Sequence, residues 1–140
     1  KDASGLSKEN RVTAHQVAHL LLKIKRDSRF APLIGGLPVG GISGTLRNRF
    51  VDTAPQAVGL VKAKTGTLNG TANLAGYVEA GDREYIFVII ADRLSKSNRA
   101  EKFARATVDR ILGKIAAPLL PVFPTQPAGE VTTEAVVTSS

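Results

Sequence analysis

The sequence predicts an α+β domain in which helices pack on an antiparallel sheet. Three β-rich runs follow one another closely, at 59–67, 72–80 and 83–91. The turns between them contain Asn-Gly and Gly-Asp pairs, which favour hairpins. One helix is expected before these runs, at 12–28, and another after them, at 98–115. The order helix, strands, helix therefore indicates an α+β layer with helices packed on a sheet.

The first helix, 12–28, has a clear start signal and one apolar face. Thr13 is its expected N-cap, since a threonine hydroxyl can accept from the free N–H groups of the first turn. His15 and His19 are expected on the polar face, and the residue after His15 is Gln16, where the zinc-protease pattern has glutamate. We interpret both histidines as solvated and predict no metal site. Spacing i, i+3, i+4, i+7 places four apolar residues on the other face: Val17, Leu20, Leu21 and Ile24.

The remaining elements are read in the same way. Residues 31–59 are rich in Gly and Pro and predict a long irregular connection with one short helix near Thr45–Arg49. The run 83–91 is almost continuously apolar, which predicts a central strand covered on both faces. The helix 98–115 is expected to turn one side to the sheet, consisting of Phe103, Thr107, Ile111, Leu112 and Ile115.

Composition limits the possible functions. Hydrophobic residues make up 43% and charged residues 22% of the 140, as in an ordinary globular protein. There is no cysteine, which excludes disulfides, thiolate metal ligands and a cysteine nucleophile within this sequence. No apolar run reaches the roughly 18 residues of a membrane span.

The charge is uneven along the chain. The net charge is +7, and residues 117–140 contain two glutamates and no Lys or Arg, so residues 1–116 carry +9. Such a charge suits nucleic acid, anionic lipid or an anionic polymer such as cell wall. The cations are scattered and aromatics are only 5%, so we predict no nucleic-acid partner. The proline-containing segment 117–140 is predicted to be a disordered or loosely draped tail that follows a domain at 1–116.

The chemistry-bearing residues stand at the end of the first β-rich run, where Lys64, Thr65, Gly66 and Thr67 are consecutive. They offer an ammonium group, two hydroxyls and, past the glycine, a backbone N–H. Gly66 has no Cβ, so a ligand can approach the strand closely. The set suits a carboxylate and a developing oxyanion side by side. A Lys-Thr-Gly tripeptide alone is more often an ordinary polar strand end.

A second motif strengthens the functional interpretation. "DASGLSKEN" at 2–10 stands about sixty residues before "KTGTLNGTANLAGYV" at 64–78. With these two motifs at this spacing, the sequence resembles the class C low-molecular-mass penicillin-binding proteins, which are D-alanyl-D-alanine carboxypeptidase/endopeptidases. The resemblance covers about residues 1–115. It implies part of a β-lactamase/transpeptidase-like domain, located outside the cytoplasm in the bacterial cell envelope.

The resemblance also implies an activity and its residues. The family cleaves peptidoglycan stem peptides through a serine acyl-enzyme, without a cofactor, and β-lactam antibiotics bind at the same site. Carried over to this sequence, Lys64 holds the terminal D-alanine carboxylate and tunes proton transfer, and Thr65 and Thr67 hydrogen-bond that carboxylate. The N–H of Thr67 supplies half of the oxyanion hole. The pocket for the stem-peptide side chain is implied to be lined by Leu6, Lys8 and Leu68.

The sequence departs from the family in one important way. No serine has a lysine three residues later, and no S-x-N is present. In the family both motifs precede the Asp-x-Ser-Gly-Leu-Ser stretch, so the resemblance implies a C-terminal portion that needs an upstream part of the same enzyme and is inactive alone. Ala3 and Lys8 replace the usual glycine and arginine. A β-lactamase of the same fold and a non-catalytic cell-wall peptide-binding module remain alternatives.

Overall fold

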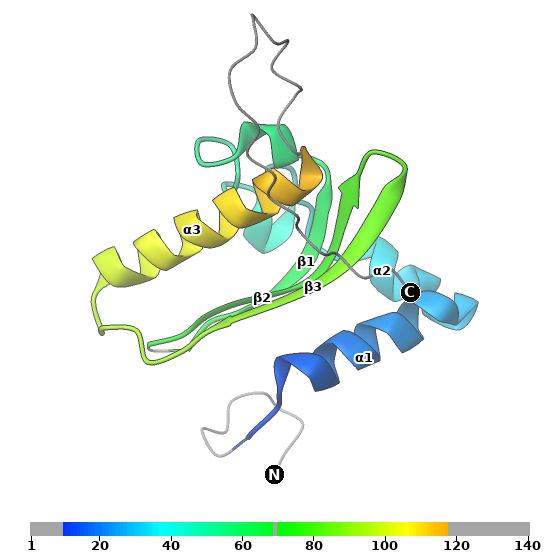
Figure 1. Cartoon of the computed structure of the whole chain (residues 1–140), viewed down its shortest axis with the longest axis horizontal. Helices are drawn as coiled ribbons and strands as arrows, with labels where there is room; N and C mark the ends of the chain where they lie inside the picture. Colours follow the sequence, from blue (N-terminus) through cyan, green and yellow to red (C-terminus); the bar gives the residue numbers. More distant parts are fainter. Residues whose placement is uncertain (1–9, 69, 118–140) are drawn as a thin grey trace, which may run out of the picture.

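A three-stranded antiparallel sheet lies between two long helices in the computed structural model, which describes residues 10–68 and 70–117 (Figure 1). The strands are β1 (Val61–Gly66), β2 (Ala72–Ala80) and β3 (Arg83–Ala91), and their order in the sheet is β1-β2-β3. The predicted α+β class is confirmed. The predicted central position of 83–91 is wrong, because β2 is the central strand of the described sheet. The predicted cover on both faces is not found either, since Phe87 is the only buried residue of β3 and Ile90 is 44% exposed.

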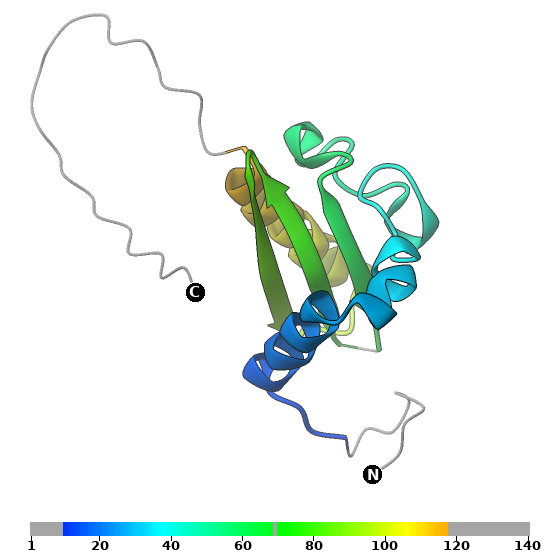
Figure 2. The same cartoon turned by 90° about the vertical axis from the view of Figure 1, so that its right-hand side faces the viewer.

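The two helices cover opposite faces of the sheet (Figures 1 and 2). Helix α1 (Ala14–Arg26) packs against β3 and β2, and helix α3 (Asn98–Ala116) packs against β2 from the other side. The continuous core lies between the sheet and α3. It consists of Leu46, Phe50, Ala54, Ala57, Val61, Ala63, Leu74, Val78, Phe87, Val108, Leu112 and Ala116.

Helix α1 begins where the sequence predicts. The Thr13 hydroxyl accepts from the Gln16 N–H at 3.1 Å, and the Gln16 side chain accepts from the Thr13 N–H at 2.9 Å, forming a capping box. No residue of α1 is buried. Of its predicted apolar face, Leu20 is 57% exposed. His15 and His19 are exposed, with ring centroids 5.0 Å apart.

Helix α3 turns a different side to the sheet from the one predicted. Phe103 is 69% exposed, and Ile111 and Ile115 are also exposed. Leu112 is buried as expected, and the other buried residues of α3 are Val108, Asp109, Gly113 and Ala116. The reason is close packing, since a Cβ on Gly113 would lie 2.7 Å from the Ala54 Cβ. Small residues bring α3 onto the connection before β1, and the bulkier apolar side chains remain outside.

The connection before β1 is more structured than expected. It contains a short helix α2 (Ala31–Gly35) and 3₁₀ turns at Ser28–Phe30, Gly44–Leu46 and Pro55–Ala57. The turn at Gly44–Leu46 overlaps the short helix expected near Thr45–Arg49. No helix in the part of the chain that the structure describes is long and apolar enough to span a bilayer.

Strands β1 and β2 approach each other closely at Gly76. A Cβ at this position would lie 2.1 Å from the Lys62 carbonyl oxygen and 2.6 Å from the Ala63 Cα. Any side chain would therefore push β1 away from β2. Glycine is required there by the pairing itself.

Candidate active site

The end of β1 presents its side chains to both faces of the sheet. Side chains alternate along a strand, and Ala63 belongs to the core under α3. Thr65 and Thr67 therefore share the α3 side, and Lys64 lies on the α1 side. Lys64 is exposed, and its Nζ donates to the carbonyl oxygen of Thr65 at 2.6 Å. The two threonine side chains thus share one face, while the Lys64 ammonium group bends back onto the backbone carbonyl of Thr65.

The outer edge of β1 is covered only over its first half. The Gly40 N–H donates to the Val61 carbonyl at 2.8 Å, and the Ala63 N–H donates to the Pro38 carbonyl at 3.0 Å. Backbone groups two residues apart point to the same edge of a strand, so those of Thr65 also point outward. Within the described residues no backbone segment pairs with this edge at Thr65. The strand therefore offers an uncovered edge where the Lys-Thr-Gly sequence begins.

A cavity of about 200 Å³ opens on the α3 side of this strand end. Its apolar lining comes from β2 and from Val108 of α3. Its polar lining consists of Thr45, Arg49, Thr65, Thr67, Asn73 and Arg105. The two threonines of the predicted site therefore face a space with hydroxyl, amide and guanidinium groups around it, which are suitable partners for an anion.

Thr45 is a residue of this site that the sequence analysis did not identify as functional. The Thr65 hydroxyl donates to the Thr45 hydroxyl oxygen at 3.2 Å. The two residues are twenty positions apart, and Thr45 lies in the 3₁₀ turn of the irregular connection. Only the position of a short helix in that connection was predictable, not the contact of its hydroxyl with β1.

A buried carboxylate fixes the connection next to Thr45. Asp109 of α3 is only 3% exposed. Arg49 Nε lies 3.0 Å and Nη2 2.5 Å from Asp109 Oδ1. The Thr53 hydroxyl donates to Oδ2 at 2.9 Å, and the Phe50 N–H donates to the same oxygen at 3.4 Å. This network, which we call the Asp109 clamp, joins the connection to α3 through several charge-assisted hydrogen bonds.

The turn after Thr67 is also held by specific contacts. The Thr71 N–H donates to the Leu68 carbonyl at 2.8 Å, and the Leu94 N–H donates to the Gly70 carbonyl at 3.0 Å. Gly70 has φ +82°, a conformation that favours glycine. Leu68 is 39% exposed, so its side chain is available at the surface.

Three predicted site residues remain: Gly66, Leu6 and Lys8. A Cβ on Gly66 would approach only the Asn73 side chain, at 3.5 Å, which is ordinary contact. The fold of this chain therefore does not itself require glycine at 66, and a ligand's approach remains the predicted reason. Leu6 and Lys8 lie outside the described residues, so their predicted position beside Leu68 stays a prediction.

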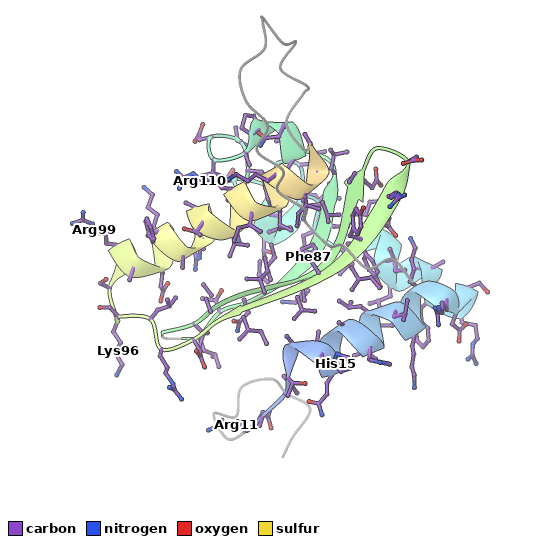
Figure 3. The ribbon with its side chains drawn as sticks, in the orientation of Figure 1. Arg11, His15, Phe87, Lys96, Arg99 and Arg110 are labelled. Atoms are coloured by element: carbon purple, nitrogen blue, oxygen red, sulfur yellow. The ribbon has the colours of Figure 1, made fainter. Side chains whose placement is uncertain are left out.

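Arginines of α3 lie both at the cavity and outside it. Arg99 and Arg110 extend from α3 away from the sheet (Figure 3). Arg105 lines the cavity and has Glu101 as its ion-pair partner at 3.6 Å. Both guanidinium groups at the cavity thus have a carboxylate partner, Asp109 for Arg49 and Glu101 for Arg105.

Known proteins resemble this chain in sequence and in structure. Residues 1–115 match the family model of the D-Ala-D-Ala carboxypeptidase 3 (S13) family. The carboxypeptidase DacB of Mycolicibacterium smegmatis is 38% identical over 117 residues, which are 80% of this chain and 25% of that protein. The D-alanyl-D-alanine carboxypeptidase of an Actinomadura species is 42% identical over 94 residues, 64% of this chain and 17% of that protein.

A solved structure gives the same result. The crystal structure of penicillin-binding protein 4 from Haemophilus influenzae, in complex with a β-lactam, matches with a TM-score of 0.68 and 30% identity. The match covers 79% of this chain and 27% of that one. The chain thus spans about a quarter of its relatives' length or less. The helix, the three strands and the final helix, together with the match over residues 1–115, show that the chain belongs to the D-Ala-D-Ala carboxypeptidase 3 (S13) family.

Proposed function

We propose that this chain is the C-terminal part of a serine-type D-Ala-D-Ala carboxypeptidase/endopeptidase that cleaves peptidoglycan stem peptides in the cell envelope, outside the cytoplasm. The observation that carries the proposal is the uncovered end of β1, where Thr65 and Thr67 border a polar cavity and Lys64 and Gly66 are their neighbours in the sequence. The family match and the β-lactam complex of the H. influenzae relative support it.

The residues have separate tasks in this proposal. The hydroxyls of Thr65 and Thr67, both at the cavity, bind the carboxylate of the terminal D-alanine. Lys64, whose ammonium group lies against the Thr65 carbonyl, helps to hold that carboxylate and tunes proton transfer. The N–H of Thr67 donates to the oxyanion that forms when the scissile carbonyl is attacked. Gly66 leaves room for the substrate backbone along the strand edge, and Leu6, Lys8 and Leu68 line the pocket for the stem-peptide side chain.

The nucleophile comes from elsewhere in the enzyme. An acyl-enzyme requires a serine activated by a nearby base, and this sequence contains no S-x-x-K or S-x-N. We therefore infer that an upstream part of the same enzyme carries both motifs and packs beside β1. The 140 residues alone are expected neither to cleave D-Ala-D-Ala nor to be labelled by penicillin.

Labelling of the full-length enzyme by a fluorescent penicillin tests the proposal. Lys64→Ala is expected to slow acylation by about 10²–10³-fold, as when one preorganised polar contact is removed from an active site. Lys62→Ala is the matched control, because Lys62 lies on the same face of β1, two residues earlier, with Glu79 as partner at 3.7 Å. Equal rates for Lys64→Ala and the wild type would contradict the assignment.

The rate at which bound penicillin is released distinguishes a carboxypeptidase from a β-lactamase. A carboxypeptidase releases bound penicillin slowly, whereas a β-lactamase of the same fold hydrolyses it with rapid turnover. Rapid release would favour the β-lactamase. Labelling of the isolated 140 residues would show that one of their own serines is the nucleophile.

A further inference from the structure

We propose that Thr45 is a positioning residue for the active site, and that its hydroxyl holds and polarises the hydroxyl of Thr65 for the substrate carboxylate. This inference rests on the proposed function and extends it to a residue outside the Lys-Thr-Gly sequence. The observations that carry it are the contact between the two hydroxyls, the shared cavity and the rigid support of the turn that carries Thr45.

The first observation is the contact itself. The two hydroxyl oxygens are 3.2 Å apart, and both residues line the same cavity. Thr45 is exposed and its side chain belongs to no core cluster. A threonine that is not needed for packing, and whose hydroxyl contacts a residue of the predicted carboxylate site, is best explained by what it does to that residue.

The second observation is the support of the turn around Thr45. On one side, the Ser43 hydroxyl accepts from the Val39 N–H at 3.0 Å. On the other side, the Asp109 clamp fixes Arg49 and the backbone of Phe50. Phe50 has φ +72°, which is costly for a residue with a bulky side chain, yet its ring is only 1% exposed. The surrounding contacts hold this conformation, so the position of Thr45 relative to β1 is well defined.

The third step is the chemistry of a hydroxyl pair. A hydroxyl has one proton to donate and two lone pairs that accept. In the structure one hydrogen bond joins the two hydroxyls, and either of them can be its donor. A carboxylate can only accept, so on its arrival the Thr65 proton turns towards it. The freed oxygen of Thr65 then accepts from Thr45, and the chain Thr45 to Thr65 to carboxylate strengthens both hydrogen bonds.

This arrangement predicts which side chains function at position 45. Serine retains the hydroxyl and should work, whereas valine has the shape of threonine without a donor and should not. A net hydrogen bond contributes about 0.5–1.5 kcal/mol. We therefore expect Thr45→Val to slow acylation by a carboxylate-bearing β-lactam by about 3- to 10-fold, and Thr45→Ser to stay close to the wild-type rate.

A double-mutant cycle in the full-length enzyme tests the inference. The variants are Thr45→Val, Thr65→Val and both together, and the readout is the rate of labelling by a fluorescent penicillin. We expect Thr65→Val to be slower than Thr45→Val, and the double variant to be no slower than Thr65→Val. Thr107→Val is the matched control, since Thr107 is an exposed threonine of α3 that donates to the Phe103 carbonyl at 3.0 Å.

The outcomes are distinguishable. If Thr65→Val slows labelling and Thr45→Val does not, or if the two effects simply add, the positioning role of Thr45 is overturned and the proposed function stands. If Thr65→Val has no effect, the assignment of the carboxylate site fails and this inference fails with it. Equal slowing by Thr45→Val and Thr45→Ser, with lowered melting temperatures, would show a purely structural role and also overturn the inference.

Discussion

The two faces of the sheet are built differently. On the α3 side, a continuous core is closed by helix α3 and by the connection before β1, and the buried Asp109 clamp joins the two. On the α1 side, no residue of the helix is buried. Its specific contacts to the sheet include the Tyr77 hydroxyl donating to the Leu21 carbonyl at 2.8 Å and a Lys25–Glu84 ion pair that is partly exposed.

This difference bears on the active site, because β1 contributes to both sides. Thr65 and Thr67 belong to the closed side, where Thr65 contacts Thr45 and the Asp109 clamp holds the nearby connection. Lys64 belongs to the open side and is exposed. Groups that bind a substrate in one geometry benefit from a preorganised support. The ammonium group, by contrast, lies against the Thr65 carbonyl at the outer edge of β1, beside which the upstream part of the enzyme is proposed to pack.

The largest loss of stability is expected when Asp109, on the α3 side of the sheet, is replaced. Asp109→Ala leaves the Arg49 guanidinium, with only 14% of its side chain exposed, and the Thr53 hydroxyl without their acceptor. Breaking a buried ion pair in this way costs about 3–5 kcal/mol. Glu84→Gln on the open side should cost about 0–1 kcal/mol, because the Lys25–Glu84 pair is solvent-accessible.

Urea unfolding of the full-length enzyme measures both variants under the same conditions. Arg49→Ala is a useful companion to Asp109→Ala, since it leaves the buried carboxylate unpaired instead of the guanidinium. Similar losses for Asp109→Ala and Glu84→Gln would contradict the distinction between the two faces.

Two leucines, one on each helix, allow the α3 side and the α1 side to be compared without any change of charge. Leu112→Ala creates a cavity at a fully buried position of α3 and should cost about 2–5 kcal/mol. Leu20→Ala, at a position of α1 that is 57% exposed, should change stability by about 0.5 kcal/mol or less. The free energy of unfolding of each full-length variant is the measurement. A comparable loss at Leu20 would reveal that further polypeptide covers the outer side of α1.

The smallest loss of stability is expected when the hydroxyl of Tyr77 is removed, and this loss depends on pH. Burial, and secondarily the charge of Glu84, raises the pKa of Tyr77 above its ordinary value of 10.0. Its contribution to stability is therefore complete below the unfolded-state pKa and is lost as the pH rises through the folded-state value. Tyr77→Phe removes the hydrogen bond to Leu21, costing about 0.5–1.5 kcal/mol at neutral pH.

Unfolding of Tyr77→Phe and wild type is compared at about pH 8 and at about pH 11, on either side of the ordinary tyrosine pKa. The difference in free energy of unfolding between the two proteins should be smaller at the higher pH. A difference that stays constant would mean that the Tyr77 hydroxyl titrates alike in the folded and unfolded chain.

The elements of the fold were predictable because their signals are local. The Thr13 cap, the Gly81-Asp82 turn and the runs 72–80 and 83–91 each depend on residues close in sequence, and the structure matches them. The exposed face of α3 was not predictable, since Phe103 is more apolar than the small residues that permit close packing. The order of strands in the sheet has no local signal either.

The candidate site also contains residues that the sequence predicts and one that it does not. Lys64, Thr65, Gly66 and Thr67 are consecutive, so the sequence alone gathers them. Thr45 joins them only through a contact made after the connection has packed against β1. Nothing in its immediate neighbours distinguishes this threonine from an ordinary turn residue.

The Asp109 clamp also has a consequence for the order of folding. Arg49 and Asp109 are sixty residues apart, whereas β1, β2 and β3 pair through short turns. Closing a long loop costs more chain entropy than closing a short one, so local hairpins form sooner. We expect the sheet to form early and the turn that carries Thr45 to be fixed late, when α3 docks. The proposed carboxylate site would then be completed only in the final step, when the rest of the domain is already assembled.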